Sequence, residues 1–290
     1  MVLLLRRFRI LVINSIKTVR IKNVVKECSD VKTFSFNLPK DNKSMCIEPK
    51  PGQFIMVWVP GVDEIPMSIS GCNNLEDWSF TVKNVGECTN ALFHLKVDDF
   101  IGIRGPYGTF FNLPSKKIKQ AFLVGGGTGI APLNFLANSL IDNKIRTVII
   151  EGAKIRDEII FSDSLNNEIS EMVYCTDDGS YGQKGFASET FEKLIAKKSI
   201  DQLKDIIVYT CGPEKMMYKV FTICEQKKIQ IQASLERMMR CGCGICGLCA
   251  VDPIGLLVCK DGPVFNSKTL REMDDFGKYK RDMTGRKIPL

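Results

Sequence analysis

The run Leu123-Val-Gly-Gly-Gly-Thr-Gly-Ile-Ala-Pro132 decides how the middle of this 290-residue chain folds. It begins inside the apolar stretch 121–124, which is typical of a buried strand, and it ends in a helical pattern. Glycines at such a strand-to-helix turn let the backbone approach a pyrophosphate, and the start of the helix adds unpaired N–H groups and a favourable dipole. The spacing departs from the strict G-x-G-x-x-G, so a glycine-rich turn without a ligand stays open as the alternative.

Alternating strands and helices follow this run and predict a parallel sheet that is covered on both faces up to about residue 228. The apolar strands lie at 147–150, 171–174 and 205–209. Two more loops come directly after such strands, Thr176-Asp-Asp-Gly-Ser-Tyr-Gly182 and Cys211-Gly-Pro213. Ligands of open α/β sheets bind outside the carboxyl ends of the strands, so we expect the loops to meet at one crevice. A packed thiol is the alternative for Cys211.

The first part of the chain has a different rhythm, in which short β-type runs alternate with turn residues. These runs lie at 32–36, 52–59, 78–82 and 100–104. They predict a closed antiparallel barrel or sandwich over about residues 17–112, with a helical insertion near 90–96. Two stretches stand out, Pro66-Met-Ser-Ile-Ser70 and Val85-Gly-Glu-Cys-Thr89. Gly86 and Thr89 offer an amide and a hydroxyl donor to a phosphate, and ordinary turns are the alternative.

Five of the 12 cysteines fall between Cys241 and Cys259. Without Cys243, the spacing of Cys241, Cys246, Cys249 and Cys259 is C-x4-C-x2-C-x9-C, which matches the plant-type loop that holds a [2Fe-2S] cluster. The glycines between them allow the torsions with which a chain wraps a cluster. A four-cysteine zinc site is the alternative, although zinc motifs usually come as two separate C-x2-C pairs. Cys243 stays open as a replacement for Cys241.

Composition narrows the class of protein. With 44% hydrophobic and 25% charged residues, the chain can bury a full core. The formal charge is +7, but residues 1–26 hold seven basic residues and no acid, which leaves 33 basic and 33 acidic residues elsewhere. A protein that binds nucleic acid spreads basic residues over a folded face, so we expect no nucleic acid partner.

Neither a membrane span nor an export signal is expected. No stretch of about 18 apolar residues exists, and Arg6, Arg7 and Arg9 interrupt the apolar start where a secretory signal needs its hydrophobic core. A basic extension fits this leader better than an organelle transit peptide, because Ser15 is its only serine. Without export, clustered thiols favour metal binding over disulfides, and we expect a cytoplasmic protein.

In combination, these motifs resemble those of the electron-transfer subunit of NAD-linked (class 1B) dihydroorotate dehydrogenase, a branch of the ferredoxin-NADP reductase superfamily. Their order over residues 17–285 and their coupling to the terminal cysteine loop carry the resemblance. The shared motifs are P-M-S-I-S (66–70), G-x-x-T (86–89), G-P-Y-G (105–108), V-G-G-G-T-G-I-A-P (124–132), T-D-D-G-S-Y-G (176–182), C-G-P-E-K-M (211–216) and the cysteine loop that ends C-K-D-G-P-V-F (259–265).

The resemblance implies three cofactors. FAD would lie along Pro66, Met67, Ser68 and Ser70, with its pyrophosphate at Gly86 and Thr89. NAD would place its nicotinamide among Gly126, Gly127, Thr128, Gly129, Asp178, Cys211, Gly212 and Pro213. A [2Fe-2S] cluster would be bound by Cys241, Cys246, Cys249 and Cys259. The implied organisation is a basic extension (1–15), an FAD-binding barrel (16–115), an NAD-binding α/β domain (116–228) and a cluster domain with its tail (229–290).

One motif departs from the superfamily. The common flavin motif R-x-Y-S pairs an arginine with the pyrophosphate and stacks a tyrosine on the flavin, whereas this chain has Ile65, Pro66, Met67 and Ser68. The dihydroorotate subfamily also tends to have P-M-S here, so FAD remains the expected flavin. Asp177 and Asp178 favour NAD over NADP, because their charge near the ribose would oppose a 2'-phosphate.

The resemblance further implies a relay with a partner. A subunit that carries FMN would oxidise dihydroorotate and pass electrons singly through the [2Fe-2S] cluster to FAD, which reduces NAD+ with a hydride. Two copies of each subunit would form a heterotetramer. The sole histidine, His94, is expected to be structural.

Two alternatives compete with this interpretation. The small flavin subunit of ferredoxin-dependent NADH:NADP oxidoreductases has similar motifs, but its cysteine loop typically begins with Asp, where this chain has Cys241. A scaffold that kept the fold and lost redox function is the alternative from another class. The intact glycine loops and the cysteine spacing argue against such a scaffold.

Overall fold

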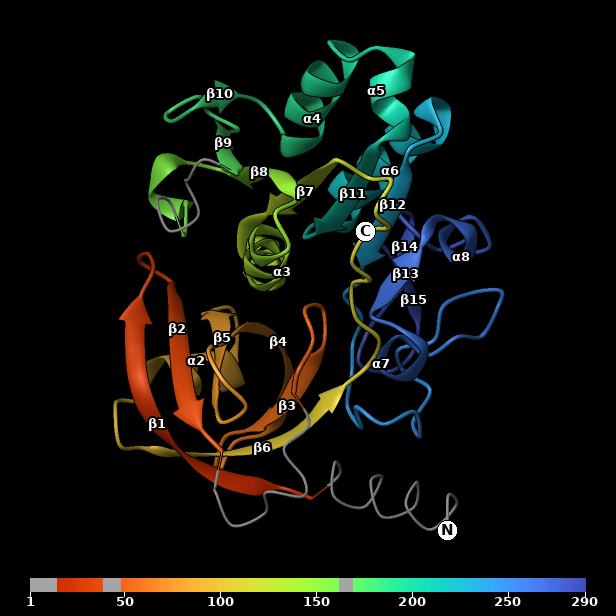
Figure 1. Ribbon diagram of the computed structural model, residues 1–290. Coiled ribbons are helices and arrows are strands. Elements are labelled where there is room, and N and C mark those ends of the chain that lie inside the picture. Colours follow the sequence, from red (N-terminus) through yellow and green to blue (C-terminus); the bar gives the residue numbers. More distant parts are fainter. Residues whose placement is uncertain (1–14, 39–47, 162–168) are drawn as a thin grey trace, which may run out of the picture.

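The computed structural model describes residues 15–38, 48–161 and 169–290. The chain forms an N-terminal barrel, a central sheet flanked by helices, and a C-terminal segment that lies beside both (Figure 1). Apart from Ser15, the predicted basic extension lies outside the described residues, as does Cys46. Within the described ranges, no helix combines the length and the apolar character that crossing a bilayer requires.

The N-terminal unit is a closed antiparallel barrel with the strand order β1-β2-β5-β4-β3-β6, as the rhythm of short strands predicted. The strands are β1 (Lys17–Lys26), β2 (Val31–Asn37), β3 (Phe54–Trp58), β4 (Glu64–Cys72), β5 (Asp77–Lys83) and β6 (Phe100–Tyr107). Aromatic residues fill the interior because alternate side chains of a strand share a face. Phe34 of β2 stacks on Phe80 of β5 with ring centroids 5.5 Å apart. Helix α2 (Glu87–His94) packs on this core through the buried Leu92.

The central unit is a seven-stranded sheet in the order β10-β9-β8-β7-β11-β12-β13. The strands are β7 (Gln120–Gly126), β8 (Arg146–Ala153), β9 (Ser170–Thr176), β10 (Gln183–Lys184), β11 (Ile206–Cys211), β12 (Gln230–Ser234) and β13 (Val264–Asn266). All neighbours are parallel except β13, which runs antiparallel to β12. The chain adds β8 and β9 on one side of β7 and then crosses to add β11 and β12 on the other. The switch point, where ligands bind in such sheets, therefore lies between β7 and β11.

Helices cover both faces of this sheet. Helix α3 (Ile130–Asp142) lies between the sheet and the barrel (Figure 1). Its buried Leu133 and Leu136 belong to the same apolar cluster as Leu123 of β7. On the other face lie α4 (Ala187–Ala196), the short α5 (Ile200–Lys204) and α6 (Glu214–Lys227). This double cover explains why the strands of the unit are continuously apolar.

The C-terminal segment shares its core with the central unit. Strands β12 and β13, which the sequence analysis missed, join it to the sheet, and β12 lies beyond residue 228, where the predicted α/β unit ended. Leu270 and Phe276 belong to the same apolar cluster as α6. The remaining elements are α7 (Val258–Asp261), α8 (Ser267–Arg271), β14 (Tyr279–Arg281) and β15 (Lys287–Pro289).

Candidate redox site

Two glycine loops touch at the switch point between β7 and β11. The stretch Gly126–Gly129 ends β7 and makes one short turn before α3, and Cys211–Pro213 follows β11. A Cβ on Gly129 would lie 2.4 Å from the carbonyl oxygen of Cys211, and a Cβ on Gly126 would lie 2.8 Å from Cδ of Pro213. The structure therefore brings together all the residues of these two loops that the sequence analysis assigned to the nicotinamide.

The backbone of these loops has the torsions and the open space that a bound nucleotide needs. Gly212 has a φ of +134°, and its Cβ would lie 2.7 Å from the carbonyl oxygen of Gly126. Gly127 has a φ of +52°, and its Cβ would have no atom within 4 Å. Only glycine combines such torsions with so close an approach of two chains. The amide groups before α3 thus remain accessible to a ligand at the carboxyl edge of the sheet.

Asp178 lies apart from these loops. It follows β9, which β8 separates from β7 in the sheet. Its carboxylate accepts hydrogen bonds from the backbone N–H of Ser180 at 2.9 Å and from the Ser180 hydroxyl at 2.6 Å. The guanidinium of Arg156 lies 5.4 Å from the ring centre of Tyr181 in the same loop. This edge of the crevice therefore carries a basic group as well as the acidic pair Asp177 and Asp178.

Glu236 is a residue of the crevice that the sequence analysis missed. It comes two residues after β12, whose Ser234 pairs with Cys211 of β11. The residue is exposed to solvent on one side. The protein around its carboxyl nevertheless limits hydration and, together with the nearby Glu214, raises the pKa of this carboxyl. Burial, followed by the charge of Glu236, also raises the pKa of the Cys211 thiol. Its position just after a parallel strand could have identified Glu236 from the sequence, but the sequence analysis did not predict β12.

The proposed flavin residues lie on β4, an inner strand of the barrel wall. Pro66 and Ser68 pair with Met56 and Phe54 of β3 and share their outward side, while Met67 packs against the barrel core. All three side chains on β4 are half-buried, although the strand has neighbours on both sides. The alternation of side chains along the strand thus divides the motif between two faces.

Ser70 lies at the far end of this motif, beside a polar cavity. It is buried, and its hydroxyl lies 3.3 Å from that of Ser79. The cavity has a volume of about 350 Å³, opens between the barrel and α3, and is also lined by Asn134 and Asp142. Ser70 therefore faces the barrel–α3 junction.

The start of α2 brings Gly86 and Thr89 together. The Thr89 hydroxyl accepts hydrogen bonds from the N–H groups of Val85 at 2.9 Å and Gly86 at 2.8 Å, and it donates to the carbonyl of Gly86 at 2.9 Å. A Cβ on Gly86 would meet no atom within 4 Å, so the helix start is open to a ligand. Because the Thr89 hydroxyl is occupied in capping the helix, the donors that remain for a phosphate are backbone amides.

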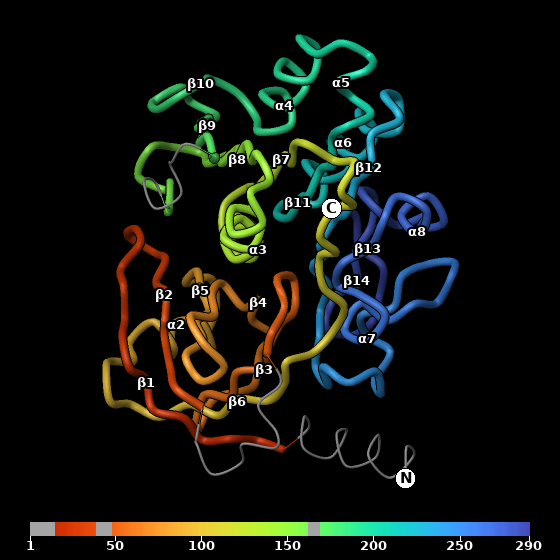
Figure 2. The backbone as a smooth tube through the Cα atoms, viewed as in Figure 1, coloured from red at the N-terminus to blue at the C-terminus, as the bar shows by residue number. Residues whose placement is uncertain are grey.

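The cysteines from Cys241 to Cys249 lie on one tight loop, residues 240–250, which we call the cluster loop. It runs beside β3 and β6 of the barrel (Figure 2). Three of its glycines, Gly242, Gly244 and Gly247, have φ between +68° and +82°, a region in which side chains are strained. A Cβ on Gly242 would lie 2.7 Å from Cγ of Met56 on β3. The loop thus wraps closely and rests directly on the barrel.

Backbone amides of the cluster loop point at sulfur atoms. The N–H groups of Ile245 and Cys246 donate to Sγ of Cys241 at 3.3 and 3.5 Å. Burial alone would raise the pKa of the Cys241 thiol, but the N–H groups of Cys246, Cys243 and Ile245 outweigh it and lower the pKa to about 6. A thiol of this kind is largely a thiolate at neutral pH, which is the form that binds iron or zinc.

The four predicted ligands interact with one another, and the Cys241 thiol also interacts with that of Cys243. The Cys241 and Cys246 thiols interact, and the Cys249 thiol interacts with that of Cys259, which lowers the pKa of Cys249 to about 7 and raises that of Cys259. Among the described residues, no three Cys, His, Asp or Glu side chains converge on a point where a single ion would sit. Four thiols on one short stretch of chain are the ligand set that a [2Fe-2S] cluster requires.

Cys243 has a different neighbour. It interacts with Cys241 and also with the guanidinium of Arg104 on β6. The same guanidinium donates a hydrogen bond to the carbonyl oxygen of Cys241 at 3.3 Å. The spare thiol thus faces the barrel rather than the pair formed by Cys249 and Cys259.

Three family models match the chain in the order of its structural units. Residues 18–112 match an oxidoreductase FAD-binding domain, residues 123–221 match an oxidoreductase NAD-binding domain, and residues 236–271 match the iron-sulfur cluster binding domain of dihydroorotate dehydrogenase B. The fold and the site therefore define an oxidoreductase subunit that combines FAD-, NAD- and iron-sulfur-binding domains.

Curated relatives identify the family to which the chain belongs. A protein of Methanocaldococcus jannaschii is 44% identical over 93% of this chain and 96% of its own length, and one of Methanocella arvoryzae is 40% identical over 92% and 96%. Both are named as probable dihydroorotate dehydrogenase B (NAD(+)), electron transfer subunit. The chain belongs to this family of electron transfer subunits, which confirms the resemblance seen in the motifs.

Solved structures confirm the fold. The structure of an NADH-dependent reduced ferredoxin-NADP oxidoreductase, described for flavin-based electron bifurcation, superimposes with a TM-score of 0.75 at 29% identity, covering 88% of this chain and 89% of that one. A ferredoxin reductase in carbazole 1,9a-dioxygenase gives a TM-score of 0.64 at 20% identity over 74% of this chain and 66% of that one. The rival family is therefore similar, but the dihydroorotate relatives match more directly.

Proposed function

We propose that this chain passes electrons from a dihydroorotate-oxidising partner subunit through a [2Fe-2S] cluster and FAD to NAD+, as a step of pyrimidine biosynthesis. The observation that carries the proposal is the contact between Gly242 of the cluster loop and Met56 of β3, on the outward side that Met56 shares with Pro66 and Ser68. Neighbouring strands lie about 4.8 Å apart, so the cluster loop sits within a strand or two of the flavin residues.

The three cofactors divide the chemistry by electron count. An iron-sulfur cluster exchanges one electron at a time, nicotinamide takes two as a hydride, and a flavin can do both. The chain's own residues bind and orient these groups. The sole histidine, His94, hydrogen bonds through Nδ1 to the carbonyl of Asn90 at 2.8 Å, which fits its expected structural role.

For the cluster, we assign Cys241 and Cys246 to one iron and Cys249 and Cys259 to the other. The paired thiols, the lowered pKa of Cys241 and the amides directed at its sulfur support this assignment. Cys243 is left out, because its second neighbour is Arg104. Hydrogen bonds from backbone N–H groups to ligand sulfurs, as seen at Cys241, tune the reduction potentials of iron-sulfur clusters in general.

For the nucleotides, we assign the nicotinamide to Gly126–Gly129 and Cys211–Pro213, where the two loops touch. Asp178 would face the ribose end of NAD, because β8 separates its strand from β7. NAD is proposed over NADP because the negative charges of Asp177 and Asp178 would oppose the 2'-phosphate of NADP. FAD is assigned to Pro66, Met67, Ser68 and Ser70, with its pyrophosphate at the helix start formed by Gly86 and Thr89, where the first backbone amides of α2 would hold it.

The partner is proposed to be the FMN-containing catalytic subunit of dihydroorotate dehydrogenase, in a heterotetramer with two copies of each chain. We propose a cytoplasmic location, because a site of free thiolates needs a reducing compartment.

The proposal is tested with both subunits purified without oxygen. The complex should contain FMN, FAD and about two irons with two sulfides per copy of this chain, and it should reduce NAD+ with dihydroorotate. The separated catalytic subunit should lose the NAD+ activity but keep activity toward an artificial electron acceptor. Co-purification with a large NADPH- and ferredoxin-binding subunit instead would transfer the assignment to the rival family.

A further inference from the structure

We propose that Arg104 is a positioning residue of the electron-transfer path: held by Glu64, it fixes the cluster loop against the barrel and places a positive charge beside the iron-sulfur centre. The inference rests on the proposed function and adds to it a residue that controls the relation between the cluster and the flavin.

The guanidinium of Arg104 is held on three sides. Its Nε donates to the Glu64 carboxylate at 2.6 Å, and its Nη2 donates to the second oxygen of the same carboxylate. Its Nη1 donates to the Tyr107 hydroxyl at 3.3 Å. A two-pronged arginine–carboxylate pair is rigid, since both planar groups match in geometry. Arg104 is thus fixed before it contacts the cluster loop.

The cluster loop meets the barrel at Arg104. Nη2 donates to the carbonyl of Cys241 at 3.3 Å. Next to Cys241, Gly242 lies so close to Met56 that its Cβ would be 2.7 Å from Cγ of that side chain. Met56 is the register partner of Arg104 across β3 and β6. A van der Waals contact and a hydrogen bond therefore fix two successive residues of the loop at one point of the barrel wall.

The Glu64–Arg104 pair reaches from the cluster loop to the strand that carries the flavin motif. Glu64 begins β4, two residues before Pro66, and Arg104 lies on β6, with β3 between the two strands. The pair thus bridges about two strand spacings, near 10 Å, on the outside of the barrel. Displacement of Arg104 would alter the placement of the cluster loop relative to the flavin strand.

The charges of the pair act on the cluster with opposite signs. Reduction adds one negative charge to the cluster, so a nearby cation favours the reduced form and a nearby anion disfavours it. The Arg104 and Glu64 side chains are only 13% and 18% exposed, so solvent and salt screen them weakly. Arg104 is the nearer of the two, because it contacts both Cys241 and Cys243.

The test is a redox titration of the anaerobic complex, followed by the electron paramagnetic resonance signal of the reduced cluster. Arg104→Gln should make the cluster harder to reduce, and Glu64→Gln should make it easier. Each shift should be up to about tenfold in the reduction equilibrium, which for one electron is about 59 mV. Arg104→Lys, which keeps the charge, should stay close to the unchanged protein.

Two comparisons separate this role from a merely structural one. If Arg104 only held the loop in place, Arg104→Gln and Glu64→Gln would remove the same ion pair and would have the same effect on the reduction potential of the cluster. A shift in the same direction in both variants, or no shift in either, would therefore overturn the inference. Arg20→Gln is the matched control, because Arg20 forms an exposed ion pair with Asp98 on the same barrel. It should leave the potential unchanged.

Failure of the inference is distinguishable from failure of the proposed function. If the protein without substitutions holds no iron and sulfide, the cluster itself is refuted. If the cluster is normal but the potentials of Arg104→Gln and Glu64→Gln do not shift in opposite directions, only the role of Arg104 is refuted. If Arg104→Gln does not retain iron, the sign of the shift in Glu64→Gln decides: an easier reduction supports the inference, and any other result overturns it.

Discussion

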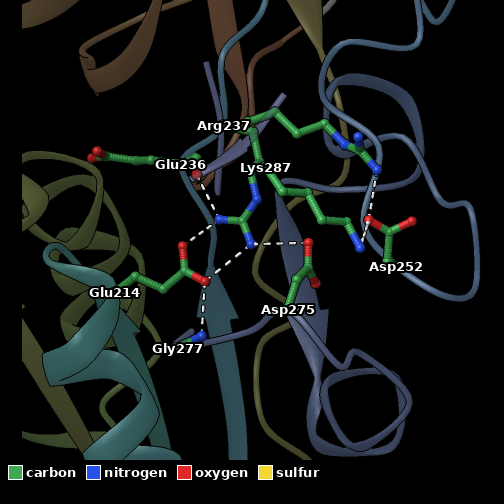
Figure 3. A network of polar contacts seen from close by, with 8 residues as sticks. Glu214, Glu236, Arg237, Asp252, Asp275, Gly277 and Lys287 are labelled. Atoms are coloured by element: carbon green, nitrogen blue, oxygen red, sulfur yellow. Dashed lines mark hydrogen bonds and ion pairs between the residues drawn. The ribbon is translucent and has the colours of Figure 1, made fainter. Parts of the chain in front are cut away.

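Arg237 and Glu214 form a buried ion pair between the segment that leads into the cluster loop and the start of α6 (Figure 3). Nη2 of Arg237 donates to Glu214 at 3.0 Å, and the two side chains are only 1% and 6% exposed. Glu214 begins α6 directly after the loop Cys211–Pro213, while Arg237 leads from β12 into the cluster loop. Arg237 also pairs with Asp275 at 3.6 Å, and Glu214 accepts the N–H of Gly277 at 2.9 Å. The loop Cys211–Pro213, the cluster loop and the C-terminal segment therefore meet at this ion pair.

Replacement of Arg237 by methionine should destabilise the protein by about 3 to 5 kcal/mol, because the buried carboxylates of Glu214 and Asp275 would lose their positively charged partner. Denaturant unfolding of the complete chain measures this change. Arg271→Met is the matched control, since its ion pair with Glu225 is largely exposed and should contribute less than about 1 kcal/mol. Equal losses in the two variants would contradict the importance of the buried pair.

Gly129→Ala should weaken nicotinamide binding more than tenfold. Gly129 has a φ of −62°, which alanine tolerates, but the new Cβ would lie 2.4 Å from the backbone of Cys211 and force the two loops apart. Titration with NADH should show the loss, while FAD and iron contents stay unchanged. Gly61→Ala controls for backbone strain without a close contact, because its φ is +77° and nothing lies within 4 Å of its Cβ. NADH binding that survives in Gly129→Ala would place the nucleotide elsewhere.

Cys246→Ser should abolish the iron-sulfur centre, whereas Cys243→Ser should keep about two irons and two sulfides per chain. The reason is the pairing of Cys246 with Cys241, in contrast to the contact between Cys243 and Arg104. Iron and sulfide analysis of both variants, with their visible spectra, checks this result. The reverse outcome would show that Cys243 is a ligand, and stoichiometric zinc without sulfide would point to a zinc site.

Glu151 should make stability depend on pH. It is almost fully buried on β8, and burial raises the pKa of its carboxyl to about 8. The folded protein therefore binds this proton more tightly than the unfolded chain, whose pKa is near the ordinary 4.5. Stability from this group is complete below about pH 4.5 and is lost as the pH rises toward 8.

Glu151→Gln removes this loss. The difference in free energy of unfolding between the Glu151→Gln variant and the protein without the substitution should grow in favour of the variant as the pH rises from about 4.5 to 8. The slope should be up to about 1.4 kcal/mol per pH unit. Denaturant melts at several pH values measure the slope. The same substitution at the exposed Glu171 controls for the loss of a carboxylate, and a parallel pH profile for both variants would refute the prediction.

Glu236→Gln should weaken the binding of NAD+ more than that of NADH. The oxidised nicotinamide ring is a cation and the reduced ring is neutral, so above the raised pKa of Glu236 its carboxylate near Cys211 favours the oxidised form. The expected change in the ratio of the two affinities is about fivefold, near 1 kcal/mol. Glu192→Gln on the exposed side of α4 is the control. An unchanged ratio would mean that Glu236 does not face the ring.

The sequence by itself determined the elements whose signals are local. The continuous apolar strands around 121–124 and 147–150 predicted a parallel sheet because both faces of such a strand are buried. The glycine run and the spacing of Cys241, Cys246, Cys249 and Cys259 likewise predicted a nucleotide loop and a cluster loop, because these chemistries require fixed local torsions and ligand intervals. The predicted barrel, sheet and cysteine loop are all present in the structure.

Only the tertiary structure decided how these parts meet. Strands β12 and β13 were missed because Gln230–Ser234 is a short, partly polar run whose strand character comes from pairing with Cys211 and Phe265 rather than from its own pattern. The contact of Arg104 with Cys241 joins residues 137 positions apart, and that of Arg237 with Glu214 joins residues 23 apart. No local pattern encodes such pairs, since they form only when the burial of apolar surface brings separate segments together.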